Sequence, residues 1–496
     1  MTERDTTLSH PWKELKARQD RKLRHFIRSH LYPFSHYYRR LFDRNRIRPE
    51  DIRTVEDLAK IPFTSKKTLL EPGQEDPQKR TLDFLLRPKE ELIKKYLPKG
   101  ELLKFISESA IRGKKRLTAH LAKEYKPIFL TATAGTTNRP LSFLYTDYDL
   151  ENLKIYGRRL FDVFDIKSDE IAVSVFPYAP HLAFWATVFG GIAANVFILS
   201  TGGGKTLGTE GNIRSIIQVK PKFLIGVPSY VYHVIKTAKE QGVSFNFLNR
   251  VILGAGRVPR GFKQKLVSML SEMGARDIRV FSTYGFTESR CAWGECPTEI
   301  DVSSGYHTYP DKEVFEIIDP DTGEVKGEGE DGEIVYSNID ARGSCVLRYR
   351  TGDLVKGGIT YNPCPHCGRT APRISSDIIR ASNIKSFQLS KVKDSLVNLN
   401  GLERLLDNQP EIDEWQIEII KKDNDPYEVD QLVLHASLLS NLDKEKFSVR
   451  INQIMIAEEE ITFNRICFVS RKEIKKMIEI ESSVKAKKIV DRRPNV

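Results

Sequence analysis

The middle of the chain alternates short apolar runs with longer segments of helical spacing. The runs are residues 171–175, 223–227 and 250–253, and the helical segments include 230–241 and 261–273. A continuous apolar run is typical of a strand that is covered on both faces, and a helix between two such strands lets them pair in parallel. This pattern predicts an α/β fold in which helices flank a parallel sheet.

The segments before and after this alternation have different residue patterns, and this difference predicts two domains. Residues 1–126 are mainly helical in character, and residues 314–353 have short strand-like runs around the turn at 319–323. A compact α+β segment follows from about residue 375 and is long enough to fold as a domain. We therefore expect a large N-terminal α/β domain (1–374) with parallel and mixed sheets and a small β subdomain. A small, mobile C-terminal α+β lid domain (375–496) would follow it.

The composition excludes several classes of protein. Apolar residues make up 40% and charged residues 29% of the 496 residues, as in soluble globular proteins. No apolar run approaches the roughly 20 residues of a membrane span, and six sparse cysteines favour a reduced compartment, so we expect a cytoplasmic protein. The net charge of +12 is concentrated at the two ends, without the aromatic-interleaved basic stripe of a nucleic-acid surface. We expect no nucleic-acid partner.

The segment 129–140, which follows an apolar run, is rich in hydroxyls and glycine. Its small residues would let backbone N–H groups approach phosphate oxygens, and the hydroxyls of Thr133, Thr136 and Thr137 could complete an anion cradle with Arg139. A threonine-rich turn without any ligand has the same composition, so this segment alone decides nothing.

Two later segments add chemistry that suits a nucleotide. Tyr284 offers an aromatic face for a purine, and Glu288, four residues on, offers a carboxylate for a hard divalent cation. Asp353 follows a tight turn and could receive two ribose hydroxyls. Each segment taken singly could instead be a turn at a sheet edge.

The order of these motifs resembles the adenylate-forming enzymes (acyl-CoA synthetase, luciferase-like), and within them the phenylacetate-CoA ligase branch. The resemblance covers most of the chain. Further segments similar to that branch are residues 35–42, 57–66, 202–204, 227–230 and 367–370.

The resemblance implies that ATP and Mg²⁺ activate a carboxylic acid as an acyl-adenylate, with release of pyrophosphate. It makes Glu288 the magnesium ligand and gives catalytic roles to Thr136 and to Lys485 in the closing segment 484–493. Lys487 or Lys488 could take the place of Lys485, or the basic tail could simply be solvated. The implied nucleotide-binding residues are Thr133, Gly135, Thr136, Thr137, Gly254, Ala255, Gly256, Thr283, Tyr284, Gly285, Thr287, Asp353 and Arg369.

The segment 176–185 is similar to the one that lines the acid pocket in this family. Its aromatic residues would suit a flat or apolar acid. Core packing is the alternative for the aromatic rings, and a helix-start position is the alternative for the histidine. The implied substrate-binding residues are Tyr178, His181, Phe184 and Trp185, together with Gly203.

Several positions depart from the family pattern. Asn138 and Ala134 replace a glycine and a serine of the phosphate loop, and Gly256 replaces a glutamate. The hinge at 373–383 is shorter than usual, with Ala381 where the family has a glycine. The expected acceptor is CoA, and the alternatives are an amine, a protein thiol or another nucleophile. A degenerate nucleotide-binding protein without activity is a further alternative, and a homodimer is left open.

Two cysteines stand at the spacing of a metal knuckle. Cys364 and Cys367 form a CxxC pair, and Cys296 with His307 could complete a Cys₃His structural zinc site. Cys291 and His366 are possible substitutes among these ligands. The alternative is a reduced turn with free thiols.

Overall fold

The computed structural model describes residues 6–70, 83–133, 141–256, 258–300, 302–380, 399–421, 430–439, 442–459, 462–480 and 486–493. The chain forms two compact units. The first comprises residues 1–170, 178–198 and 283–378, and the second comprises 171–177, 199–282 and 379–496. The predicted boundary between residues 374 and 375 stays a prediction.

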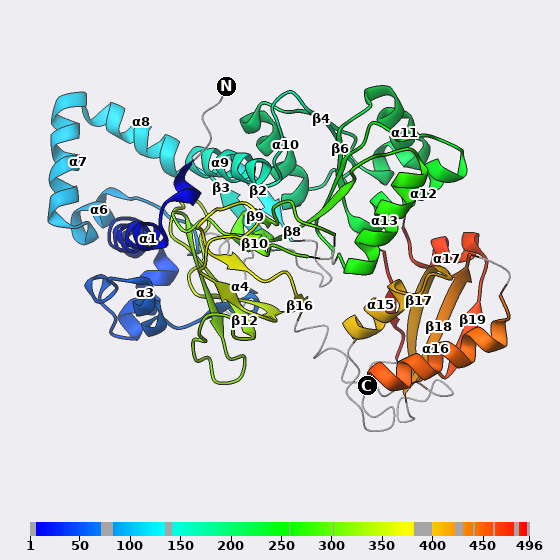
Figure 1. The fold of residues 1–496 in the computed structure, drawn as a ribbon. Helices are drawn as coiled ribbons and strands as arrows, with labels where there is room; N and C mark the ends of the chain where they lie inside the picture. The colour runs from blue at the N-terminus through cyan, green and yellow to red at the C-terminus, as the bar shows by residue number, and fades with distance from the viewer. Residues whose placement is uncertain are drawn as a thin grey trace. The chain divides into compact units, whose positions relative to one another are not determined.

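The first unit begins with the helical region that the sequence predicts (Figure 1). Later in this unit, a capping box starts α9: the Thr146 hydroxyl accepts a hydrogen bond from the backbone N–H of Asp149, whose carboxylate accepts one from the backbone N–H of Thr146. The helices of this unit are η1 (Thr6–Ser9), α1 (Trp12–Phe26), η2 (Ile27–Leu31), α2 (Tyr32–Phe34), α3 (His36–Arg44), η3 (Pro49–Asp51), η4 (Val55–Lys60), α4 (Lys66–Leu70), α6 (Glu90–Tyr96), α7 (Lys99–Arg112), α8 (Lys114–Tyr125), α9 (Asp147–Val163), α10 (Leu182–Ala194) and η5 (Thr287–Ser289).

Short strands build the sheets of the first unit. One sheet has the order β1-β13-β12-β11, with β16 on β13; another has the order β10-β15-β14; and β2 pairs with β3. The pairing of β11, β12 and β13 is antiparallel, as expected for the predicted β subdomain. The strands are β1 (Thr64–Ser65), β2 (Phe129–Ala132), β3 (Ser142–Tyr145), β9 (Cys291–Gly294), β10 (Tyr306–His307), β11 (Glu313–Ile318), β12 (Gly332–Asn338), β13 (Tyr349–Val355), β14 (Ile359–Thr360), β15 (Arg373–Ile374) and β16 (Ile378–Arg380), of which only Ile378 belongs to this unit.

The core of the first unit is rich in aromatic side chains. Tyr38, Phe42, Tyr145, Trp293 and Tyr309 are all fully buried in one hydrophobic cluster. Large rings of this kind remove much apolar surface from water and pack in tilted and edge-to-face pairs. This core surrounds the strands that carry the candidate site.

The second unit contains the predicted parallel sheet, which confirms the α/β fold class. Strands β4, β6, β7 and β8 pair in parallel in that order, with β5 beside β4. The last four residues of β8 lie in the first unit, where they pair antiparallel with β9. The elements are β4 (Ile171–Ser174), β5 (Phe197–Ser200), α11 (Gly204–Val219), β6 (Phe223–Gly226), α12 (Pro228–Glu240), β7 (Arg250–Leu253), α13 (Arg260–Glu272) and β8 (Arg279–Phe286).

The C-terminal part of the second unit is an α+β segment, as the sequence predicts. Its sheet has the order β19-β18-β17-β20, and α16 runs along this sheet (Figure 1). Phe447, Ile451 and Met455 of α16 join the buried cluster formed with β17 and β18. The elements are α15 (Leu399–Asp407), β17 (Ile412–Lys421), β18 (Asp430–Leu438), α16 (Lys444–Glu459), β19 (Arg465–Phe468), α17 (Arg471–Met477) and β20 (Ile489–Asp491).

Among the described residues, no helix is both long enough and apolar enough to cross a membrane.

Candidate active site

Tyr284 and Asp353, which the sequence places 69 positions apart, meet through a hydrogen bond. The Tyr284 hydroxyl on β8 donates to the Asp353 carboxylate on β13 at 2.9 Å. Asp353 follows Gly352, whose φ of 72° is a backbone conformation that favours glycine, and Asp353 is buried. The predicted adenine wall and the predicted ribose acid therefore lie side by side in the first unit.

Aromatic neighbours hold the ring of Tyr284. Its centroid lies 5.6 Å from that of Trp293, 5.8 Å from that of Tyr306 and 5.7 Å from that of Phe286. The glycine after it, Gly285, makes the close approach of β9 possible, because a Cβ there would lie 3.1 Å from the Cys291 carbonyl oxygen. The ring thus belongs to a tightly packed layer.

A buried acid anchors this aromatic layer. Glu313 accepts a hydrogen bond from the Trp293 indole N–H at 2.6 Å and another from the Tyr309 backbone N–H at 2.8 Å. Burial raises the pKa of Glu313 to about 8. Because Trp293 packs against Tyr284, Glu313 fixes the neighbour of the predicted adenine wall.

Glu288, the predicted magnesium ligand, lies in the short turn η5 after β8. Its Oε1 atom accepts a hydrogen bond from the Tyr349 hydroxyl on β13 at 2.7 Å, and the side chain is buried. Thr287 begins the same turn, and its carbonyl oxygen accepts the Arg290 backbone N–H at 3.2 Å. Tyr349 is a site residue that the sequence analysis missed, although it precedes Asp353 by the same four positions that separate Tyr284 from Glu288.

His181 and Thr133 lie at the end of β2. The Ala132 carbonyl oxygen can only accept, so the His181 Nδ1–H donates to it, at 3.1 Å. The Thr133 hydroxyl accepts the Leu141 backbone N–H at 3.0 Å. His181 is thereby placed next to the start of the predicted phosphate loop.

The three aromatic residues of the predicted acid pocket contact one another. Tyr178 packs edge-on against Phe184 at 5.2 Å between centroids, and Phe184 packs edge-on against Trp185 at the same distance. The Trp185 ring also packs against Phe129 of β2. Tyr178 is 67% exposed, so its ring is available to a ligand, whereas Phe184 is buried.

Four of the predicted residues that the structure describes lie in the second unit. Gly203 caps α11 with a φ of 75°, and a Cβ there would lie 3.0 Å from the Val175 carbonyl oxygen. Gly254, Ala255 and Gly256 follow β7, and Ala255 has a φ of 60°.

The remaining predicted residues have varied positions. Thr283 lies on β8, and the Arg369 guanidinium donates to the Asp162 carbonyl oxygen at 2.7 Å. The predictions for Gly135, Thr136, Thr137 and Lys485 lie outside the described residues, as do Ala134, Asn138 and Ala381.

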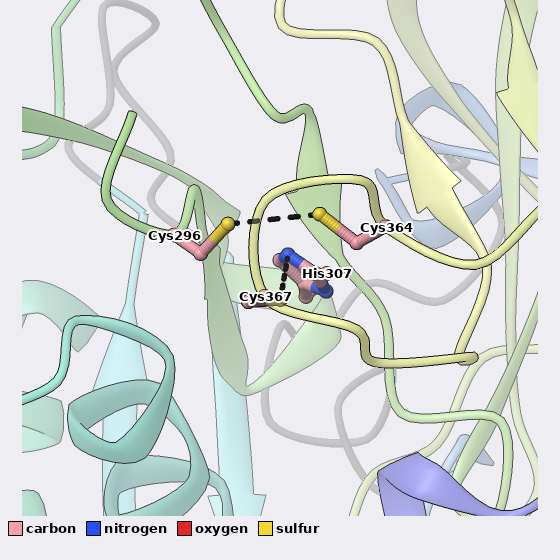
Figure 2. Close-up of side chains that lie close together, drawn as sticks. All are labelled: Cys296, His307, Cys364 and Cys367. Atoms are coloured by element: carbon pink, nitrogen blue, oxygen red, sulfur yellow. Dashed lines mark hydrogen bonds between the residues drawn. The ribbon is translucent and has the colours of Figure 1, made fainter. Parts of the chain in front are cut away.

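A second cluster in the first unit brings together the four residues of the predicted zinc site. Figure 2 shows the side chains of Cys296, His307, Cys364 and Cys367 converging from three segments of the chain. Their ligand atoms all lie within 4.8 Å of one another. Gly368 closes the CxxC turn with a φ of 73° and donates its N–H to the Cys364 carbonyl oxygen.

Two of the spacings between these atoms match those of a tetrahedral zinc site. With Zn–S bonds of about 2.3 Å, tetrahedral geometry requires a sulfur-to-sulfur separation of about 3.8 Å. The Sγ atoms of Cys296 and Cys364 are 3.7 Å apart, and Cys367 Sγ lies 3.6 Å from His307 Nε2. Hydrogen bonds with the Cys296 and Cys364 thiols lower the pKa of Cys367. Three sulfurs and one imidazole form a donor set that zinc prefers.

Comparison with known proteins places this chain in a family. The model of the AMP-binding enzyme family matches residues 45–343. The phenylacetate-coenzyme A ligase of Thermus thermophilus is 25% identical over 394 residues, which cover 77% of this chain and 76% of the relative. The phenylacetate-coenzyme A ligase of Escherichia coli (strain K12) is 24% identical, with 76% of each chain covered.

Solved structures show the same fold. A 2-hydroxyisobutyryl-CoA ligase in its postadenylation state, bound to 2-HIB-AMP, has a TM-score of 0.75 and 16% identity, with 99% of this chain and 94% of that chain covered. The same ligase bound to 2-HIB-AMP and CoA in its thioesterification state has a TM-score of 0.58. The chain therefore belongs to the AMP-binding enzyme family, and its predicted resemblance to the phenylacetate-CoA ligase branch of the adenylate-forming enzymes is confirmed.

Proposed function

We propose that this protein is an AMP-forming acid–thiol ligase, which activates a carboxylic acid with ATP as an acyl-adenylate and then transfers the acyl group to CoA. The observation that carries this proposal is the hydrogen bond from Tyr284 to Asp353, with Glu288 held four residues beyond Tyr284. Family membership and the CoA-ligase relatives support both half-reactions.

The described residues suit Mg²⁺ and a nucleoside. Glu288 offers a carboxylate, the oxygen donor that Mg²⁺ prefers, and no described residue donates a hydrogen bond to its Oε2 atom. Bound magnesium would neutralise charge on the phosphate oxygens during attack by the carboxylate. Asp353 would accept hydrogen bonds from the ribose hydroxyls, and Tyr284 would present its ring to adenine while its hydroxyl holds Asp353 in place.

The remaining catalytic assignments are extensions of the family resemblance. Thr136 and the neighbouring loop residues would bind the phosphates, and Lys485 would approach the reacting oxygens with its ammonium group. The C-terminal domain would deliver this lysine by closing over the site.

For the acid, we propose a flat or apolar group that packs against Tyr178 and Trp185. The exposed ring of Tyr178 and its contacts with the neighbouring aromatic side chains support this. His181 would orient the acid through its Nε2 atom, because its Nδ1–H already donates to the Ala132 carbonyl oxygen.

An acid-dependent pyrophosphate assay tests the proposal. Pyrophosphate release is measured with a panel of aryl, fatty and amino acids, with hydroxylamine as a trap for the adenylate. Addition of CoA then distinguishes thioester formation from transfer to an amine or a protein thiol. No pyrophosphate release with any acid, but retained ATP binding, would favour the degenerate nucleotide-binding alternative.

We also propose that Cys296, His307, Cys364 and Cys367 bind one structural zinc ion. All four positions would be filled by protein, so the ion would join β10 and the end of β9 to the loop between β14 and β15 and take no part in the reaction. The purified protein should contain one zinc per chain by elemental analysis, and Cys364→Ser should abolish it and lower the melting temperature. Retained zinc in that variant would contradict the assignment.

A cytoplasmic location and the homodimer stay predictions.

A further inference from the structure

Two tyrosines and two carboxylates form a reciprocal pair of hydrogen bonds in the first unit. Tyr284 precedes Glu288 by four residues, and Tyr349 precedes Asp353 by four residues. Each tyrosine hydroxyl donates to the acid of the other segment: Tyr284 to Asp353 at 2.9 Å and Tyr349 to Glu288 at 2.7 Å. The two segments are therefore connected twice, at the two acids that the proposed function assigns to ribose and to magnesium.

Tyr349 is held more firmly than a surface hydroxyl would be. Its backbone pairs with Thr64 of β1 on one side and with Tyr336 of β12 on the other, and its side chain is only 2% exposed. Its ring stacks on that of Phe286 with an interplanar angle of 25°. The hydroxyl therefore has a fixed position from which to hold Glu288.

The turn that carries Glu288 is also fixed by hydrogen bonds. The Ser289 hydroxyl oxygen lies 2.6 Å from the Phe286 carbonyl oxygen and 2.9 Å from the Cys291 carbonyl oxygen, so its single proton is shared between these two acceptors. The Tyr336 hydroxyl donates to the Ser289 carbonyl oxygen at 3.3 Å. Among the described residues, Tyr349 is the one that donates to the carboxylate itself, while these other bonds fix the backbone.

We propose that Tyr349 is a positioning residue for the metal-binding carboxylate, which it holds by Oε1 so that Oε2 is directed to the cation. This inference rests on the proposed function, because it needs Glu288 to bind magnesium. A carboxylate that must stop rotating in order to bind a cation loses entropy, and a hydrogen bond made beforehand removes that cost. Loss of such a partner typically weakens metal binding about 10- to 100-fold.

Direct metal binding tests this role without the reaction. Mn²⁺ replaces Mg²⁺ as the probe, and electron paramagnetic resonance measures its binding to the protein with ATP present and no acid. Tyr349→Phe removes one oxygen and should raise the Mn²⁺ concentration at half-saturation about 10- to 100-fold. Tyr336→Phe is the matched control, because it removes a buried hydroxyl that reaches the same turn but bonds a backbone carbonyl; its half-saturation should equal that of the wild type.

Two unnatural residues at position 349 keep the test valid if the phenylalanine variant folds poorly. 4-Aminophenylalanine keeps a donor and should bind Mn²⁺ nearly as the wild type does, whereas 4-methylphenylalanine fills the same space without a donor and should bind weakly. Equal binding by both would overturn the proposal, as would equal binding by Tyr349→Phe and the wild type. A wild-type protein with no ATP-dependent Mn²⁺ binding would instead overturn the proposed function on which this inference rests.

Discussion

The Tyr284 hydroxyl connects the two residues assigned to adenosine, and its removal should affect ATP binding specifically. Tyr284→Phe keeps the ring for adenine but removes the hydrogen bond from Tyr284 to Asp353. A hydrogen bond to a charged group contributes about 1.5–3 kcal/mol, so KM for ATP should rise at least about 10-fold while kcat changes little. Steady-state kinetics with varied ATP measures this.

The matched control for Tyr284→Phe is Tyr178→Phe, which removes an exposed hydroxyl near the proposed acid pocket. This second variant should leave KM for ATP unchanged. An unchanged KM in Tyr284→Phe as well would mean that Asp353 does not bind the nucleotide in the way proposed.

The buried Glu313 should make stability depend on pH in the neutral range. Burial raises its pKa in the folded protein to about 8, from 4.5 in the unfolded chain. The folded state therefore holds one more proton than the unfolded state between these values. The contribution of Glu313 to the free energy of unfolding is therefore complete below about pH 4.5. It falls by about 1.4 kcal/mol for each pH unit as the pH rises from there toward 8.

Glu313→Gln keeps the acceptor for Trp293 and removes the titrating group. Denaturant unfolding at pH 5.5, 6.5 and 7.5 should show the wild type losing stability relative to this variant at each step. Glu151→Gln, at an exposed position, is the control and should parallel the wild type. Parallel curves for all three proteins would show that Glu313 is ionised in the folded core.

At the scale of residues, the sequence predicts which side chains have useful chemistry but not how they pair. Tyr284, Glu288 and Asp353 stand out by type and spacing. The bonds from Tyr284 to Asp353 and from Tyr349 to Glu288 depend on the placement of β8 relative to β13, which no local pattern contains. The buried Glu313 also gives no sequence signal, because an acid in a strand is usually solvent-facing.

At the scale of elements, the close contact between α9 and α10 predicts that a larger residue at this contact destabilises the protein. A Cβ on Gly157 would lie 2.3 Å from the Gly190 Cα, so Gly157→Ala must push the two helices apart. The cost should be about 1–3 kcal/mol in the free energy of unfolding. Because α10 carries Phe184 and Trp185, KM for the acid should rise as well.

Gly100→Ala is the control for this substitution. Gly100 lies in α7, and a Cβ added to it would have no other atom within 4 Å, so alanine there should be neutral or slightly stabilising. Thermal melting of both variants measures the difference. Equal melting temperatures would contradict the close packing of α9 on α10.

Sequence patterns predict the elements of the parallel sheet well. The expected strand at 250–253 has the bounds of β7, and the helix expected at 261–273 is α13 (Arg260–Glu272). Short turns and two-residue strands such as β1 depend on tertiary partners and have no periodicity of their own.

At the scale of the whole molecule, the sequence predicts the fold class and the family, and the boundary it predicts between residues 374 and 375 stays a prediction. Residues 171–177 and 199–282 belong to a different unit from the segments that flank them in the sequence. This happens because a parallel sheet brings together strands that are distant in the sequence.

The most direct test of the account is acid-dependent exchange of labelled pyrophosphate into ATP, measured for the wild type and for Glu288→Gln with an acid chosen from the panel. The account predicts exchange by the wild type that needs both the acid and Mg²⁺, at least about 100-fold less exchange in the variant, and thioester formation when CoA is added. Exchange in Glu288→Gln at the wild-type rate and with the same Mg²⁺ dependence would contradict it.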